Sequence, residues 1–163
     1  MINIRKLQQK DRAAVERILG GTQMFTAAEI AVALELIDIH LNNKDQKDYH
    51  IFVAETPDGG VAGYVCYGPT AVAEGTYDLY WIAVDVNRQG QGIGNQLLTF
   101  AEKEAQRNKG RLMIIETSSQ EKYAPTQGFY FRNHYSLAAR IKDFYRPGDD
   151  RLIYVKYFNH HKN

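Results

Sequence analysis

One stretch constrains the fold more than any other: "WIAVDVNRQGQGIGNQLLTFAEKEAQ", which runs from Trp81 to Gln106. An apolar segment leads into glycine at three alternate positions, Gly90, Gly92 and Gly94, and then into the periodicity of an amphipathic helix. A strand, a short turn and a helix in this order indicate a crossover unit. The next apolar segment, 111–117, should therefore lie parallel to the first.

The rest of the chain alternates between strand and helix patterns. Thr26 caps one helix, because Glu29 three residues later completes a capping box, and the apolar stripe of that helix runs to Leu41. The other expected helices are 11–19, 91–109 and 121–132, and the expected strands are 2–7, 49–56, 61–69, 76–86, 111–117, 134–142 and 151–158. This order, β-α-α-β-β-β-α-β-α-β-β, predicts a single α/β domain over residues 1–163. Its mixed sheet should carry helices on both faces.

Composition excludes several classes of function. The net charge of +1 gives no electrostatic reason to expect nucleic acid or an anionic membrane as a partner. No apolar run approaches the roughly 20 residues that a membrane span needs. The lone cysteine, Cys66, fits a buried strand thiol in a reducing compartment, so we expect a cytoplasmic protein. The five histidines are scattered, so no metal site is expected.

The three glycines precede a helix, where backbone N–H groups are unpaired and the helix dipole is positive. A glycine lets a phosphate approach the backbone because it has no Cβ. We therefore interpret Gly90, Gly92 and Gly94 as a cradle for a diphosphate. The plainer alternative is a flexible turn, for which one glycine would be enough.

Two familiar phosphate-binding motifs do not fit. A P-loop needs Gly-Lys-Ser/Thr, whereas Asn95 and Gln96 follow Gly94. The dinucleotide fingerprint needs glycine at position 95 as well. Glu116 ends the next strand, where a ribose-binding acid could lie, but the unit follows an antiparallel hairpin and this context disfavours a nicotinamide site.

The segment "QGQGIG" resembles motif A of the GNAT superfamily of acyl-CoA N-acyltransferases, whose pattern is Gln/Arg-x-x-Gly-x-Gly/Ala. Gln89, Gly92 and Gly94 occupy its defining positions. The preceding strand is similar to the fourth strand of the family, with Val86 where proline is common.

A second segment, "FYFRNHY", is similar to motif B of the same family, Tyr-x-x-x-Gly-Phe. Tyr130 matches its tyrosine, His134 stands at the glycine position and Tyr135 stands at the phenylalanine position. The glycine position suggests a left-handed turn, which histidine tolerates at some cost. Tyr123 stands where the family often has a cofactor-binding asparagine.

The resemblance implies the GNAT fold, in which the fourth and fifth strands splay apart and acetyl-CoA lies in the gap. Its pantetheine arm would pair with the backbone of the fourth strand, and its diphosphate would accept hydrogen bonds from the glycine-rich loop. The implied cofactor-binding residues are Ile82, Ala83, Val84, Gln89, Gly90, Gln91, Gly92, Ile93, Gly94 and Tyr123.

The resemblance also implies acetyl transfer to an amine. Tyr130 matches the usual general acid, which protonates the departing thiolate. Glu116 is the candidate base if burial at its strand end raises its pKa, or else it is a carboxylate paired with Lys or Arg. Asp85 and Glu29 are weaker candidates, and some family members use no dedicated base. The N–H of Val84 is expected to meet the oxyanion.

Acceptor specificity is expected from Gly20 to Phe25 and from a loop at 142–150. The latter is similar to the final hairpin of ribosomal-protein and N-terminal acetyltransferases of the group, with Phe144 and Tyr145 in place of paired tyrosines. Packed turn aromatics are the alternative. Asp149 and Asp150 would either attract an amine or cap the turn. The expected substrate-binding residues are Phe25, Glu29 and Tyr145.

The predicted function is therefore an N-acetyltransferase that uses acetyl-CoA and acts on a small amine, an amino acid or a peptide N-terminus. A non-catalytic acyl-CoA sensor on the same fold is the alternative. The resemblance also allows a homodimer, because family members are often dimers.

Overall fold

A computed structural model describes residues 1–158 of the chain. The chain forms two compact units, and each unit is built from two separate segments. The first unit comprises Met1–Gly68 and Tyr80–Glu104, and the second comprises Pro69–Leu79 and Ala105–Asn163. Each unit is described below by itself.

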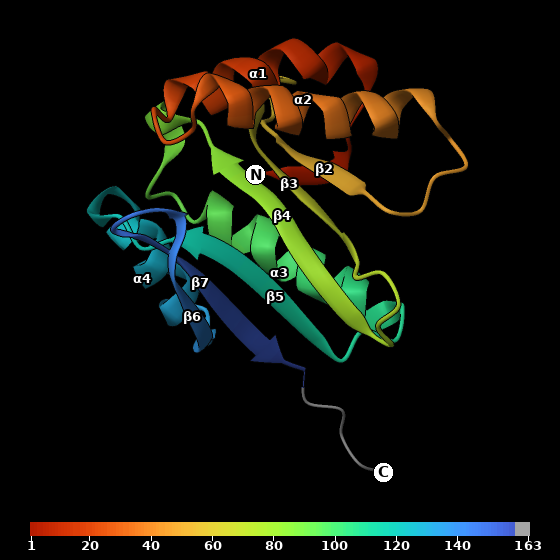
Figure 1. Ribbon diagram of the computed structural model, residues 1–163. Coiled ribbons are helices and arrows are strands. Elements are labelled where there is room, and N and C mark those ends of the chain that lie inside the picture. Colours follow the sequence, from red (N-terminus) through yellow and green to blue (C-terminus); the bar gives the residue numbers. More distant parts are fainter. Residues whose placement is uncertain (159–163) are drawn as a thin grey trace. The chain divides into compact units, whose positions relative to one another are not determined.

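The elements follow the predicted order, which is confirmed (Figure 1). The strands are β1 (Asn3–Lys6), β2 (His50–Glu55), β3 (Val61–Pro69), β4 (Thr76–Val84), β5 (Leu112–Ser118), β6 (Ser136–Arg146) and β7 (Asp149–Tyr157). The helices are α1 (Arg12–Gly21), α2 (Ala27–Asn42), α3 (Ile93–Arg107) and α4 (Ala124–Arg132), with short 3-10 helices η1 (Gln9–Asp11), η2 (Val86–Arg88) and η3 (Glu121–Tyr123).

The seven strands are hydrogen-bonded in the order β1-β2-β3-β4-β5-β7-β6. Strands β4 and β5 run parallel, as the crossover through α3 predicts, and their ladder pairs Thr76–Leu79 with Leu112–Ile115. The ladders β1–β2, β2–β3, β5–β7 and β6–β7 are antiparallel. The prediction of a mixed α/β sheet is therefore confirmed.

In the first unit, helices cover both faces of β2. Ile51 and Val53 are fully buried in a cluster with side chains of α1 and α2, which lie side by side (Figure 1). Phe52 lies between them in sequence and points to the opposite face, where its ring centroid is 4.6 Å from that of Phe100 in α3. Cys66 of β3 belongs to the first cluster and is buried, as expected for a strand thiol.

A close approach of β3 to β4 depends on one glycine in the first unit. A Cβ added at Gly63 would lie 2.8 Å from the carbonyl oxygen of Ala83 and 3.2 Å from Cδ1 of Leu97. The first contact is with backbone, which cannot move aside cheaply. Any larger residue at position 63 would therefore displace β4.

The helices mostly follow their predicted bounds. In α2, Thr26 Oγ1 accepts a hydrogen bond from the Glu29 amide at 3.2 Å, and the Thr26 amide donates to Glu29 Oε2 at 2.6 Å, so the capping box is confirmed. Helix α1 extends through Gly21, although Gly20-Gly21 was expected to end it earlier. The predicted stripe of α3 is fully buried, and it comprises Ile93, Leu97, Ala101 and Ala105.

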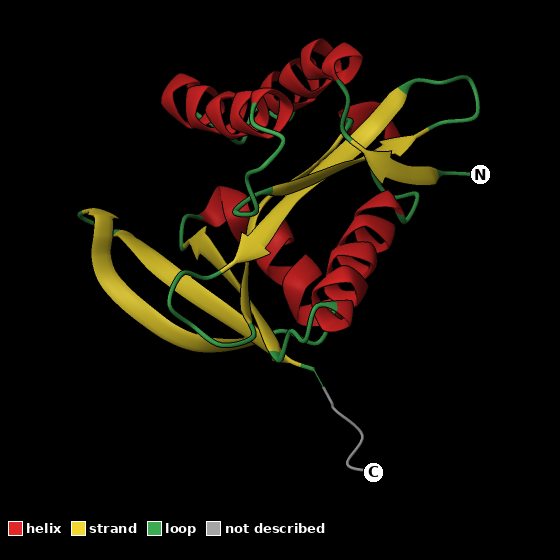
Figure 2. Cartoon of the chain, turned by 90° about the vertical axis from the view of Figure 1, so that its right-hand side faces the viewer, coloured by secondary structure: helices red, strands yellow, loops and turns green. Residues whose placement is uncertain are grey.

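In the second unit, β6 and β7 form a long, curved hairpin (Figure 2). The predicted loop at 142–150 is wrong, because β6 continues to Arg146 and β7 begins at Asp149. Two physical reasons account for the longer strands. Phe144 and Tyr145 favour strand conformation, and Gly148, with a φ of +81°, permits a tight turn.

Within residues 1–158, every helix is too short or too polar to span a membrane.

Candidate functional site

The glycine-rich loop Gln89–Gly94 lies in the first unit, where it follows η2 and includes the first two residues of α3. Gly90 and Gly92 have φ angles of +76° and +79°, which L side chains rarely adopt. A Cβ added to either residue would meet no atom within 4 Å. The chain therefore needs these glycines for their backbone conformation, and the space beside them is open.

The backbone N–H groups of this loop are not used by the other described residues. The helical bonding of α3 begins with the amide of Gln96, which donates to the carbonyl oxygen of Gly92 at 3.1 Å. From Gln89 to Gly94, no backbone N–H donates a hydrogen bond to another residue in the described part of the chain. These groups also lie at the positive end of the α3 dipole, so the loop can bind an anion.

The side chain of Gln89 helps to hold the loop against the strand that precedes it. Its Nε2 donates to the carbonyl oxygen of Val84 at 3.3 Å. Asp85 Oδ1 accepts from the amide of Asn87 at 2.9 Å and so caps η2, the short helix that contains Val86. These two bonds lie at the start of the loop.

The predicted cofactor strand segment, Ile82–Val84, ends β4 in the first unit. The ladder between β4 and β5 stops at the pair Leu79 and Ile115, although β4 itself continues to Val84. Ala83 is buried, and Ile82 and Val84 are half-buried.

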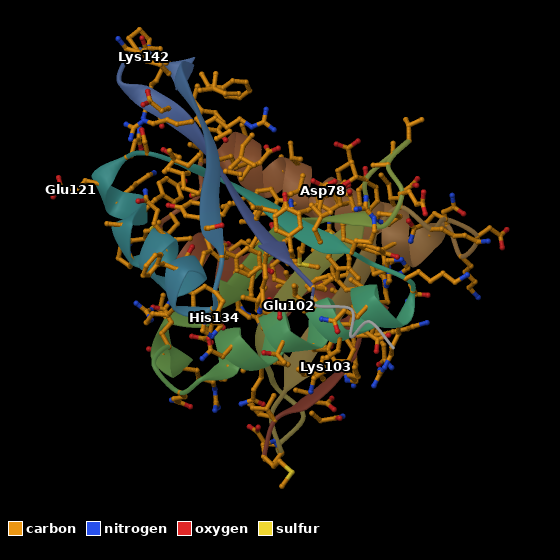
Figure 3. All side chains as sticks on the ribbon, turned by 90° about the horizontal axis from the view of Figure 1, so that it is seen from below. Asp78, Glu102, Lys103, Glu121, His134 and Lys142 are labelled. Carbon is orange, nitrogen blue, oxygen red and sulfur yellow. The ribbon has the colours of Figure 1, made fainter. Side chains whose placement is uncertain are left out.

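The motif B residues lie at the end of α4 in the second unit. Tyr130 is only 5% exposed, and burial raises the pKa of its phenol, which therefore stays protonated at neutral pH. Its hydroxyl makes no hydrogen bond with another residue of the described range 1–158. His134, at the end of α4 in Figure 3, has a φ of +69°, so the predicted left-handed turn at the glycine position is confirmed.

Aromatic rings surround Tyr130 within its own unit. The centroid of Tyr130 lies 6.0 Å from that of Tyr135 and 6.1 Å from that of Tyr154. The backbone carbonyl of Tyr130 accepts from the amide of Tyr135 at 3.0 Å, which closes the turn after the helix. The cluster fixes the ring of Tyr130 and leaves its hydroxyl as the group able to donate.

Glu116, also in the second unit, is less buried than the sequence led us to expect. Its side chain is 40% exposed and forms an ion pair with Arg151 of β7. The expectation of burial is therefore wrong, and the alternative of a carboxylate paired with Lys or Arg is the arrangement present. The physical reason is that Glu116 lies on the exposed side of β5, between the buried Ile115 and Thr117.

Arg151 was not identified from the sequence. Besides pairing with Glu116, its guanidinium carbon lies 4.8 Å from the centroid of Phe144. Phe144 and Tyr145 are each 48% exposed, with ring centroids 5.0 Å apart. Tyr145 is thus accessible on β6, next to Phe144 in sequence, and Lys142 lies near the tip of the same hairpin in Figure 3.

The other predicted site residues occupy defined positions in their units. In the first unit, Phe25 makes an edge contact with Trp81 of β4 at 5.1 Å between centroids, and one carboxylate oxygen of Glu29 is occupied by the capping box. In the second unit, Lys122 lies over the ring of Tyr123 at 5.1 Å. Trp81 was not among the predicted site residues, although an aromatic residue next to the cofactor strand segment could have indicated it.

The paired carboxylates of the final hairpin serve its turn. Asp150 accepts from Arg140 Nε at 2.5 Å and from the amide of Asp143 at 2.9 Å. Asp149 accepts from the hydroxyl of Ser118, and both aspartates are buried. Of the two roles considered for them, the structural one is therefore present.

A family model described as "Acetyltransferase (GNAT) domain" matches residues 47–137, more than half of the chain. The structure of a GNAT-family protein from Desulfovibrio desulfuricans is 44% identical with a TM-score of 0.92, and the match covers 96% of this chain and 99% of that one. No curated protein matches the chain.

Two further solved structures show more distant similarity. A ribosomal-protein-alanine N-acetyltransferase from Brucella melitensis is 26% identical with a TM-score of 0.76, and the match covers 96% of this chain and 99% of that one. A protein from Salmonella typhimurium, whose structure contains acetyl-CoA, is 20% identical with a TM-score of 0.75. That match covers 100% of this chain and 97% of the other and shows likeness of fold alone.

Proposed function

The chain belongs to the GNAT family of acetyltransferases, and we propose that it transfers an acetyl group from acetyl-CoA to a primary amine. One observation carries the proposal: the backbone N–H groups of the loop Gln89–Gly94 donate no hydrogen bond to any described residue. A diphosphate is the part of acetyl-CoA that such a loop can hold. The acceptor is a small amine, an amino acid or a peptide N-terminus.

The donor is proposed to lie along the first unit. Its diphosphate would accept hydrogen bonds from the loop, and its pantetheine arm would pair with the backbone of Ile82–Val84. The end of the β4–β5 ladder at Leu79 supports this arrangement, because the later residues of β4 have no β5 partner in that ladder. The N–H of Val84 would then stabilise the oxyanion as the amine attacks the thioester.

Tyr130 is proposed as the general acid. Its place at the tyrosine position of motif B supports the role, because a phenol is protonated at neutral pH and can donate its proton to the departing thiolate. The attack forms the new C–N bond, the C–S bond breaks, and the sulfur takes the proton of Tyr130.

Glu116 is proposed as the residue that removes the extra proton from the amine. Its carboxylate is exposed and paired with Arg151, so the proton would reach it through water or after the acceptor displaces the guanidinium. Phe25 and Tyr145 are proposed to contact the acceptor, and Glu29 to shape the segment that carries Phe25. Tyr123 is proposed to contact the cofactor. The buried, lone Cys66 supports a cytoplasmic setting.

A turnover screen tests the function. Release of free thiol from acetyl-CoA would be followed with polyamines, amino acids, aminoglycosides and short peptides as acceptors. We expect thiol release above the acceptor-free rate with at least one class. CoA binding with no turnover across the whole panel would contradict the enzyme and favour a non-catalytic acyl-CoA sensor.

The variant Tyr130→Phe tests the proposed role of Tyr130 as general acid. We expect turnover to fall by about 100-fold or more while acetyl-CoA affinity changes little, because the proton is needed only as the thiolate leaves. Tyr154→Phe is the matched control, since it removes a phenol hydroxyl from the same ring cluster. Equal losses in both variants, or a parallel loss of affinity, would contradict the role.

A further inference from the structure

The ion pair between Glu116 and Arg151 joins two neighbouring strands of the second unit. Glu116 lies on β5 and Arg151 on β7, and Nη2 of the arginine contacts Oε1 of the glutamate. In the ladder between these strands Glu116 is opposite Ile153, so Arg151 lies diagonally across from it on the same face of the sheet. Both side chains are partly exposed. The carboxylate is therefore accessible to an acceptor while the arginine holds it.

The guanidinium of Arg151 also packs on Phe144 of β6. Its central carbon lies 4.8 Å from the centroid of the Phe144 ring, which is within the range of a cation–π contact. Because β7 lies between β5 and β6 in the sheet, the three strands contribute one residue each to a row: Glu116, Arg151 and Phe144. The row restrains the guanidinium at two points, so the arginine can hold the carboxylate in one orientation.

One N–H group of Arg151 is left unused by this arrangement. Its Nε is buried and has no hydrogen-bond partner among residues 1–158. A buried donor without an acceptor costs about 1–3 kcal/mol, whereas an exposed ion pair stabilises a protein by only about 0–1 kcal/mol. Stability alone therefore does not account for a guanidinium directed at Glu116, and a role at the carboxylate does.

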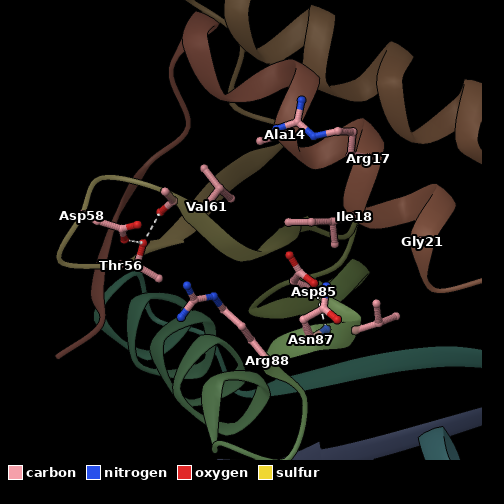
Figure 4. A pocket seen from close by; sticks show the side chains of 12 residues that line it. Ala14, Arg17, Ile18, Gly21, Thr56, Asp58, Val61, Asp85, Asn87 and Arg88 are labelled. Atoms are coloured by element: carbon pink, nitrogen blue, oxygen red, sulfur yellow. Dashed lines mark hydrogen bonds between the residues drawn. The ribbon is translucent and has the colours of Figure 1, made fainter.

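An arginine of the first unit shows what distinguishes this pair. Arg88 lines a cavity together with Asp58, and the two interact through charge alone (Figure 4). The carboxylate of Asp58 is bonded to the hydroxyl of Thr56 in its own turn instead. Arg88 thus does not orient the carboxylate near it, whereas Arg151 contacts the carboxylate of Glu116 directly.

We propose that Arg151 is a positioning residue, which is itself held by Phe144 and which orients the Glu116 carboxylate toward the acceptor amine. The inference rests on the proposed function and on the role proposed there for Glu116. A guanidinium stays protonated throughout, so Arg151 exchanges no proton and acts only through the carboxylate. Orientation matters because a displacement of about 1 Å at a reacting group costs about 100-fold in rate.

A double-mutant cycle tests the proposal. The value of kcat/KM would be measured for the wild type, Arg151→Gln, Glu116→Gln and the double variant, with an acceptor that the turnover screen identifies. We expect losses of about tenfold in Arg151→Gln and about 100-fold in Glu116→Gln. The double variant should be no slower than Glu116→Gln, because Arg151 has nothing left to position. The KM for acetyl-CoA should be the same in all four proteins.

Three further variants separate positioning from a structural role. Arg151→Lys keeps the positive charge and should recover part of the loss, and its own cycle with Glu116→Gln replaces the first if Arg151→Gln does not fold. Phe144→Leu should cause a smaller loss that also disappears in the Glu116→Gln background. Arg140→Gln is the matched control, since it removes an arginine paired with Asp150 in the same hairpin and should change kcat/KM by less than about twofold. Circular dichroism shows whether each variant is folded.

Four outcomes would overturn the proposal. They are full activity of Arg151→Gln, full activity of Glu116→Gln, additive losses in the double variant, and an equal loss in Arg140→Gln. Absence of thiol release by the wild type with every acceptor is a different result, because it contradicts the acetyltransferase proposal itself. The two failures are therefore distinguishable by the activity of the wild type.

Discussion

Two glycine-containing turns of the first unit share a backbone conformation but differ in their hydrogen bonding. The turn from Thr56 to Gly60 joins β2 to β3, and the loop Gln89–Gly94 leads into α3. Gly59 has a φ of +83° and Gly92 has a φ of +79°. A Cβ added to either residue would meet no atom within 4 Å.

The two turns differ in whether their backbone amides donate hydrogen bonds. In the hairpin turn, the Thr56 amide donates to Gly60 at 2.9 Å, the Gly59 amide donates to Thr56 at 2.8 Å, and the Thr56 hydroxyl donates to Asp58 at 2.5 Å. In Gln89–Gly94, no backbone amide donates to another described residue. A positive φ thus explains why glycine is present in both. The unbonded backbone amides are the reason why we propose the loop Gln89–Gly94, and not the hairpin turn, as a ligand-binding site.

The largest expected effect comes from placing the same carboxylate in both turns. Gly92→Asp should weaken CoA binding by about 100-fold, because a carboxylate would face the diphosphate and like charges at an interface cost several kcal/mol. Gly59→Asp introduces the same residue at nearly the same φ, so it should cost stability without changing CoA affinity. Isothermal titration with CoA measures both.

An equal loss of CoA affinity in the two aspartate variants would contradict this distinction between the two turns. The loss at position 92 would then reflect general backbone strain, and the loop would have no special relation to the diphosphate.

A smaller effect, on the free energy of unfolding, is expected from removing a hydrogen bond of the turn from Thr56 to Gly60. Thr56→Val removes the hydroxyl of a buried threonine, which donates to Asp58 and the Gly60 carbonyl, so the free energy of unfolding should fall by about 1–2 kcal/mol. Gln89→Ala removes one exposed bond to Val84, so its change should stay within about 0.5 kcal/mol. Urea unfolding measures both, and a larger loss for Gln89→Ala would contradict the distinction.

The smallest expected effect is a dependence of the free energy of unfolding on pH, which comes from Asp58 in the turn from Thr56 to Gly60. The Thr56 hydroxyl, and to a lesser extent nearby backbone and Arg88, lower the pKa of Asp58 from its ordinary value of 3.8. A lowered folded-state pKa stabilises the fold above pH 3.8, and that contribution is lost as the pH falls below it.

Asp58→Asn isolates this contribution. The difference in unfolding free energy between the wild type and the variant should be constant near neutral pH and shrink below about pH 4. Urea unfolding across pH 3–7 measures it, and a difference that grows on acidification would have the wrong sign. No ionisable side chain lies in Gln89–Gly94, so this loop contributes no comparable pH dependence of stability.

Features set by neighbouring residues could be predicted from the sequence. The capping box joins Thr26 to Glu29, only three residues apart, and the stripe of α3 repeats every four residues from Ile93 to Ala105. The left-handed turn at His134 was predicted because motif B places a glycine there. In each case a local constraint leaves few conformations to choose from.

Features that depend on distant residues could not be predicted. The partner of Glu116 is Arg151, which lies 35 positions away and approaches it only through the register of β5 and β7. Arg17 and Arg88 line one cavity although no sequence spacing relates them. The hairpin strands were predicted too short because "FYRPGDDR" combines strand-forming aromatics with turn-forming residues.

Gly63 has a consequence for anyone who redesigns this chain. The position contacts no proposed ligand, yet the methyl group of an alanine would push against Ala83, inside the strand segment that we assign to the donor. Random libraries aimed at new donor preferences should therefore keep codon 63 fixed. Without that precaution, clones with a displaced strand would be mistaken for clones with altered recognition.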